Sequence, residues 1–139
     1  MTTPPIAKPL PRPESRALTA PFWEATRRHE LVIQRCKQCS SWVFHPREQC
    51  PVCFSQKLEW APVSGRGRVY TFTIVHQPAH PGFQAETPYT YAIVQLDEGV
   101  RVPTNIVECA PEDVRVDMPV VAVFDDVSAD WTLVKFKPA

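Results

Sequence analysis

Two C-x-x-C pairs constrain the fold of this chain more than any other feature. Cys36 and Cys39 form the first pair, Cys50 and Cys53 form the second, and ten residues separate the pairs. A C-x-x-C turn brings two thiolates to one metal ion, and two such turns on a hairpin complete a tetrahedral site. The gap is shorter than in the commonest such pattern, but it suits a single returning hairpin. The spacing therefore predicts a zinc ribbon with these four cysteines as ligands.

Other chemistry for the cysteines is less well supported. Disulfides are disfavoured because the N-terminal residues contain no apolar run of a signal peptide, so we expect a cytoplasmic protein. Iron also accepts four thiolates, as in rubredoxin, and ligand type alone does not separate it from zinc. We expect one structural Zn²⁺ ion, because four protein ligands leave no open position for a reacting water. His45 is an alternative ligand that four cysteines make unnecessary, and the isolated Cys109 is expected to pack as a small apolar residue.

Prolines limit the rest of the fold, since the chain has 16 of them and only four glycines. Proline fixes φ and donates no backbone hydrogen bond, so a helical bundle is excluded. Residues 1–17 contain five prolines and predict an extended arm without a core of its own. Helical spacing follows at residues 19–29, where Thr19 is the expected cap and Pro21 suits a first turn. A helix this short needs Phe22 and Trp23 to pack against the protein or a partner.

The C-terminal part of the chain has the pattern of a small antiparallel barrel. Short strands are expected within residues 58–76 and at residues 89–96, 100–107, 120–126 and 132–136, with turn signals between them. The prediction is a mainly β protein with an arm at 1–17, a helix and rubredoxin-like zinc ribbon at 18–57, and a five-stranded OB-fold barrel at 58–139. An SH3-like barrel or a small sandwich remains open. Trp60, Tyr70 and Trp131 could stack nucleic-acid bases if they are exposed, but aromatic residues of this kind more often fill a barrel core, and we expect them there.

One long loop stands out within the expected barrel. Residues 76–88 contain three prolines, and two histidines, His76 and His80, flank the start of this segment. A loop of this length is often functional. The segment is either a surface excursion stiffened by proline or a binding loop that presents His80 and Phe83. The chain contains no Ser/His/Asp signature, glycine-rich phosphate loop or paired catalytic carboxylates. We therefore expect it not to be catalytic alone, with any nucleophile supplied by another subunit.

Charge is divided unequally along the chain, although its sum is zero. Residues 1–60 carry nine basic and five acidic side chains, whereas residues 61–139 carry six and ten. OB-folds and zinc ribbons both serve in single-stranded nucleic-acid binding, which is the alternative function. The acidic barrel half disfavours it, because phosphate binding needs a positive field. No apolar run is long enough to span a membrane.

Four stretches of the sequence closely resemble one family of small zinc-ribbon and OB-fold proteins, formerly a domain of unknown function. They are PFWEATRRHELVIQRCKQCSSWVFHPREQCPVC, LEWAPVSGRGRVYTFTIVHQPAHPGF, PYTYAIVQLDEGVRVPTNIVEC and PEDVRVDMPVVAVF. The resemblance implies a non-catalytic partner of thiolase-like enzymes that act on acyl-CoA: thiolases, hydroxymethylglutaryl-CoA synthase-like enzymes, retro-aldolases or acyltransferases. It also implies a heterotetramer or larger heteromer that degrades lipid, steroid or aromatic compounds, in which this chain helps to shape the acyl-CoA channel.

The resemblance extends to single residues. It implies metal binding by Cys36, Cys39, Cys50 and Cys53, and partner binding by Phe22 and Trp23 on the helix and by His80 and Phe83 on the loop. In the family a glycine often follows each C-x-x-C pair, whereas this sequence has Ser40 and Phe54 at these positions. Glycine accepts a positive φ more easily than a residue with a side chain, so Ser40 and Phe54 predict strained turns and weaker metal binding. Within this hypothesis Arg66 and Arg68, a close basic pair in the acidic half, are expected to meet CoA phosphates, with solvated turn charges as the alternative.

Overall fold

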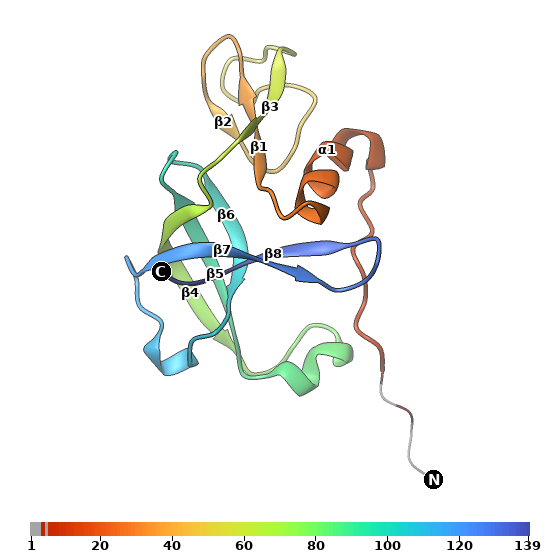
Figure 1. The fold of residues 1–139 in the computed structure, drawn as a ribbon, viewed down its shortest axis with the longest axis vertical. Helices are drawn as coiled ribbons and strands as arrows, with labels where there is room; N and C mark the ends of the chain where they lie inside the picture. Colours follow the sequence, from red (N-terminus) through yellow and green to blue (C-terminus); the bar gives the residue numbers. More distant parts are fainter. Residues whose placement is uncertain (1–3, 5) are drawn as a thin grey trace.

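A three-stranded ribbon sits at one end of a five-stranded barrel in the computed structural model, which describes residues 4 and 6–139 (Figure 1). No helix in this described part is long and apolar enough to cross a membrane. The helical elements are α1 (Arg16–Arg27), η1 (Pro81–Glu86) and η2 (Pro111–Asp113). The strands are β1 (Val32–Cys36), β2 (Trp42–Val43), β3 (Leu58–Pro62), β4 (Arg66–Val75), β5 (Tyr89–Leu96), β6 (Arg101–Ile106), β7 (Pro119–Asp126) and β8 (Thr132–Pro138).

The ribbon is an antiparallel sheet with β1 in its centre, in the order β2-β1-β3. Strand β3 pairs with β1 along its whole length, from Val32 opposite Pro62 to Cys36 opposite Leu58. Residues 58–62 therefore lie in the ribbon sheet, although the sequence analysis placed the start of the barrel at residue 58. The first barrel strand begins at Arg66, after the turn at Gly65, where φ is +72°.

The barrel is closed, with strand order β4-β5-β6-β8-β7 and with β7 pairing back onto β4. All neighbouring strands are antiparallel except β6 and β8, which run parallel where Ile106 lies opposite Phe136. This is the arrangement of a five-stranded Greek-key OB barrel. The expected mainly β architecture, with an N-terminal helix, a ribbon and an OB-fold, is confirmed.

One hydrophobic core connects the ribbon and the barrel. The buried barrel residues form a cluster that includes Phe136, the largest fully buried side chain among the described residues. Leu31 and Ile33, from the start of the ribbon, belong to the same buried cluster, and Phe22 and Phe44 pack against it. Because these side chains share one core, the helix, ribbon and barrel are held together as a unit.

The helix begins earlier than expected. The N–H of Thr19 already donates to the carbonyl of Ser15 at 3.0 Å, so Thr19 lies within the first turn and is not the cap. Pro21 lies inside the helix and not in its first turn, so its missing N–H removes a backbone hydrogen bond and its ring crowds the carbonyl four residues before it. The helix ends near the expected residue, because His29 adopts a φ of +59°, which does not continue a right-handed helix.

None of the three aromatic residues assigned to the barrel core lies there. The pairing of β4 with β5 shifts register between Val69 and Thr71, and this irregularity leaves Val69 fully buried and Tyr70 47% exposed. The guanidinium of Arg101 lies 3.8 Å from the centre of the Tyr70 ring. The other two are only half-buried, Trp60 on β3 of the ribbon and Trp131 beside Trp23 of the helix.

Replacing Phe136 with alanine is expected to lower the free energy of unfolding by about 3–5 kcal/mol, because it leaves a cavity in the shared core. The control is Val116→Ala, since Val116 is 56% exposed and its truncation should change stability by less than about 0.5 kcal/mol. Denaturant unfolding followed by tryptophan fluorescence measures both variants. Equal destabilisation by the two substitutions would contradict this description of the core.

Candidate metal centre and aromatic cleft

Two matching backbone turns hold the four cysteines. In the first turn, the N–H of Cys36 donates to the backbone carbonyl of Ser41 at 2.8 Å, and the N–H of Ser40 donates to the carbonyl of Cys36 at 2.9 Å. In the second turn, the N–H of Cys50 donates to the carbonyl of Ser55 and the N–H of Phe54 donates to the carbonyl of Cys50, at the same two distances. The repeated pattern makes the two C-x-x-C pairs structurally equivalent.

The four sulfur atoms lie at the separations that a tetrahedral metal site requires. Cys36 Sγ is 3.5 Å from Cys53 Sγ, and Cys39 Sγ is 3.7 Å from Cys50 Sγ. All four lie within 4.8 Å of one another. Sulfurs about 2.3 Å from a zinc ion in a tetrahedron are about 3.8 Å apart, so the cysteines fit such an ion. The set is complete without His45 and without Cys109.

The surroundings of the four thiols are electrostatically unequal. Hydrogen bonds with the Ser41 hydroxyl and from its backbone N–H lower the pKa of Cys39 to about 6. For Cys53, a backbone hydrogen bond from Ser55 favours the thiolate, but burial and the neighbouring thiols outweigh it and raise the pKa to about 12. A divalent cation removes this conflict, because its charge stabilises all four thiolates together.

Backbone strain occurs at the two positions where the sequence departs from the family. Ser40 has a φ of +65° and Phe54 a φ of +63°. The positive φ expected at both positions is confirmed, at a cost of roughly 1–2 kcal/mol for a residue with a side chain. Phe54 is also 69% exposed, so its ring gains little from packing within this chain.

Gln34 supports the metal centre, although the sequence did not single out this residue. Its side chain is buried within β1; its Nε2 donates to the carbonyl of Arg47 at 2.9 Å, and its Oε1 accepts from the Arg47 N–H at 2.7 Å. The two bonds tie β1 to the segment between the cysteine pairs. The available signal was a polar glutamine directly after the apolar run Leu31–Ile33.

Phe22 and Trp23 join the helix to both other parts of the molecule. The two rings are 5.1 Å apart, and Trp23 is also 5.1 Å from Trp131 of the barrel in an edge-to-face contact. Phe22 lies 6.1 Å from Phe44 of the ribbon. Both residues are half-buried and line an apolar cavity of about 550 Å³ between α1, the ribbon and strands β6 and β8.

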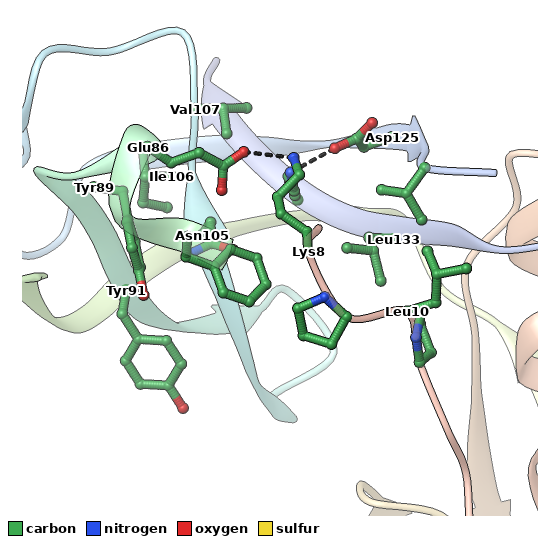
Figure 2. Close-up of a pocket in the computed structure, with 15 residues that line it drawn as sticks. Lys8, Leu10, Glu86, Tyr89, Tyr91, Asn105, Ile106, Val107, Asp125 and Leu133 are labelled. Atoms are coloured by element: carbon green, nitrogen blue, oxygen red, sulfur yellow. Dashed lines mark hydrogen bonds and ion pairs between the residues drawn. The ribbon is translucent and has the colours of Figure 1, made fainter. Parts of the chain in front are cut away.

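His80 and Phe83 are close together, with ring centres 6.2 Å apart, but they lie on η1 at the other end of the barrel (Figure 1). His80 Nδ1 accepts a hydrogen bond from the N–H of Gly82 at 2.9 Å, which caps η1. Phe83 lines a second cavity, of about 830 Å³ (Figure 2). This cavity and the one beside Phe22 share Tyr91, Asn105, Leu133 and Lys135, so the two aromatic sites flank one continuous side of the barrel.

Arg66 and Arg68 lie together at the start of β4, away from both aromatic sites. Both are exposed, and Nη1 of Arg68 donates to the carbonyl of Asp117 at 2.9 Å. Arg66 lines a shallow cleft beside His29 and Glu30. The pair thus remains available to solvent.

Thr132, Asp126 and His29 form a hydrogen-bonded chain with the residue types of a catalytic triad. The hydrogen bonds do not follow the order of a triad, because the carboxylate and not the imidazole lies in the middle. The Thr132 hydroxyl donates to Asp126 Oδ1 at 2.6 Å, and His29 Nε2 lies 3.1 Å from the same carboxylate. These contacts, first with Thr132 and then with His29, lower the pKa of Asp126. The hydroxyl contacts the acid and not the imidazole, so the imidazole does not take its proton. His29 instead stacks on Phe124 and fixes the helix end to β7.

Comparison with known proteins supplies the family. A family model described as the ChsH2 rubredoxin-like zinc ribbon domain matches residues 23–59, and one described as the ChsH2 C-terminal OB-fold domain matches residues 60–125. The chain is 42% identical over 104 residues to a DUF35 domain-containing scaffold protein of Methanocaldococcus jannaschii, across 74% of this chain and 73% of that protein. The chain belongs to the DUF35 family. The resemblance stated from the sequence is therefore confirmed.

Other relatives of this DUF35 chain are subunits of enzymes. It is 39% identical over 129 residues to a probable enoyl-CoA hydratase alpha subunit of Thermomonospora curvata, across 93% of this chain and 40% of the relative. The chain thus spans about two fifths of that relative's length. It is 41% identical over 69 residues, 49% of this chain, to benzoylsuccinyl-CoA thiolase subunit BbsA of Geobacter metallireducens, covering 44% of that subunit.

A solved structure matches this DUF35 chain over most of its length. The structure, named Ltp2-ChsH2(DUF35) aldolase, aligns with a TM-score of 0.81 at 38% sequence identity. The alignment covers 91% of this chain and 98% of the matched chain.

Replacing Cys50 with serine is expected to reduce bound metal at least about tenfold, because a buried member of the four-sulfur set is lost. Cys109→Ser is the control, since Cys109 lies outside this set, and we expect unchanged metal content. Elemental analysis of the purified variants measures the ratio of metal to protein. A full complement of metal in Cys50→Ser would contradict the assignment.

Proposed function

We propose that this chain is a non-catalytic subunit that docks on a thiolase-like enzyme, either a thiolase, a retro-aldolase or an acyltransferase. The observation that carries this proposal is the match to a chain of the structure named Ltp2-ChsH2(DUF35) aldolase, which covers 91% of this chain at 38% identity. The kinship with a thiolase subunit adds support. Within the described residues, the histidine contacts serve packing and capping and contain no activated nucleophile. The chemistry would then belong to the partner.

We propose one structural Zn²⁺ ion as the resident metal, bound by Cys36, Cys39, Cys50 and Cys53. A closed set of four sulfurs suits zinc and leaves no position for a substrate, while iron remains the less favoured ion. The ion would stabilise the ribbon, whose own buried cluster contains only Cys36, Val43 and Cys50. Ligation by free thiols also fits the reducing cytoplasm.

We propose that the partner contacts Phe22 and Trp23 at one site and His80 and Phe83 at the other. The two sites flank the same side of the barrel through the shared residues of the two cavities. All four side chains are half-buried, so each is positioned by this chain and still presents surface. Such pre-positioned aromatic residues bind with little loss of conformational entropy.

Nucleic-acid binding by the barrel is the weaker alternative. Among the exposed aromatic residues, Tyr70 already has one face of its ring occupied by the guanidinium of Arg101. The net negative charge of residues 61–139 would also repel phosphates. Protein docking requires neither a free stacking face nor a positive field.

Tagged protein isolated from its own cells is expected to carry a thiolase-like enzyme as a heterotetramer or larger heteromer, detected by native mass spectrometry. The double variant His80→Ala, Phe83→Ala should capture at least about tenfold less partner, because it removes two aromatic contacts. Val116→Ala, an exposed aliphatic residue, is the control with unchanged capture. Recovery of this chain only with nucleic acid, or only with copies of itself, would refute the proposal.

We further propose that Arg66 and Arg68 contact CoA phosphates in the assembled complex. The variant Arg66→Ala, Arg68→Ala should raise the dissociation constant for CoA by about tenfold or more, since charge-assisted hydrogen bonds are lost. Arg115→Ala removes another exposed arginine of the barrel half and should leave affinity unchanged. Calorimetric titration of the complexes measures all three proteins. An unchanged affinity in the double variant means that the arginines are solvated turn charges.

A further inference from the structure

The N-terminal arm lies against the barrel. It runs from the start of α1 down the side of the barrel toward η1 (Figure 1). Lys8, Pro9, Leu10 and Pro11 line the cavity of about 830 Å³, together with residues of η1, β5, β6, β7 and β8. Residues 8–11 therefore form one wall of a groove that the barrel completes (Figure 2).

A specific ion pair holds the arm to the loop between β4 and β5. Lys8 Nζ lies 2.8 Å from Glu86 Oε1, and this contact raises the pKa of Lys8. A second pair in the groove, Lys135 with Asp125, comes from the barrel alone. In Figure 2, Lys8 points toward Glu86 across the groove, and Leu10 lies on the same side as Leu133.

Gly82 provides the space that the arm occupies. A Cβ at this position would lie 2.7 Å from the carbonyl oxygen of Ala7 and 3.0 Å from Cα of Lys8. Gly82 is not among the residues with positive φ, so its backbone conformation does not require glycine. The close approach of the arm backbone, together with His80 at 3.0 Å, excludes a larger residue.

The covered surface is the one that OB barrels use for extended ligands. In that fold the second and third strands bind polymers, together with the loops after the first and fourth strands. The corresponding elements here are β5, β6, the segment that contains η1, and the segment that begins at Val127. All four contribute lining residues to the groove beneath the arm.

We propose that residues 6–11 are an intramolecular peptide ligand of this barrel face, and that the groove is selective for an extended, proline-containing segment with a lysine opposite Glu86. Pro9 and Pro11 favour the extended polyproline form, which loses little entropy on docking. While the arm is bound, it closes the face to other extended ligands. This inference does not depend on the proposed partner enzyme.

The arm is held weakly enough to be exchanged. Ile6 is 58% exposed and Leu10 is 45% exposed, so the arm buries little apolar surface. The Lys8 and Glu86 side chains are 49% and 42% exposed, and ion pairs in such positions are weak. The tether compensates, because a short linker gives the arm an effective concentration in the millimolar range. A free peptide therefore competes poorly with the attached arm.

The test uses the full chain and a fluorescent peptide with the sequence of residues 6–13, IAKPLPRP. In the variant Lys8→Glu the attached arm is repelled by Glu86, so the peptide should bind this variant about fivefold more tightly than the wild type by fluorescence anisotropy. In the double variant Lys8→Glu, Glu86→Lys the ion pair is reversed, so the attached arm should bind the groove again and suppress binding of the peptide. Adding Gly82→Ala to Lys8→Glu should abolish it, because the new Cβ occupies the path of the peptide.

Lys57→Glu is the matched control, because it makes the same charge change at an exposed lysine beyond the groove and should behave as the wild type. Metal content and circular dichroism establish that each variant is folded. Equal peptide binding by wild type and Lys8→Glu, or binding by neither, would overturn the proposal. Binding of single-stranded oligothymidylate to Lys8→Glu in place of the peptide would overturn the selectivity for peptide.

Discussion

Strand β1 connects the metal centre to the barrel core, and the rest of the structure depends on this connection. Its last residue, Cys36, is one of the four clustered cysteines, and three residues earlier Ile33 is fully buried in the core that contains Phe136. Gln34, between them, ties the strand to the segment that separates the cysteine pairs. Order in the ribbon therefore also places Phe44 against the barrel core, 6.1 Å from Phe22 of the helix.

The histidines and aromatic residues of this chain build surfaces and joints. His29 stacks on Phe124, His80 caps η1, and Trp23 meets Trp131 across the boundary between helix and barrel. A nucleophile would need a free base beside it, and these contacts provide none in the described residues. The molecule is thus suited to present two aromatic sites and a groove at fixed positions, which is what a scaffold for another enzyme requires.

Local patterns in the sequence predicted much of the fold and the metal centre. The C-x-x-C spacing identified the four cysteines whose sulfur atoms cluster in the structure, and alternation placed β5 at residues 89–96 as observed. The missed features depend on contacts between distant segments. The register shift that exposes Tyr70 arises from the pairing of β4 with β5, and β3 joined the ribbon because β1 offered it a full-length partner. The early helix start reflects a backbone bond from Thr19 to Ser15, whose own side chain makes no cap hydrogen bond.

The sequence by itself determined the chemistry of the metal site, the order of ribbon and barrel, and the extended character of the arm, because these follow from short-range spacing and from the fixed φ of proline. Only the tertiary structure decided where the arm lies. Lys8 and Glu86 are 78 residues apart in the chain, and nothing local to either predicts the pair. Their contact, and the space that Gly82 leaves for the arm, exist only once the barrel has closed.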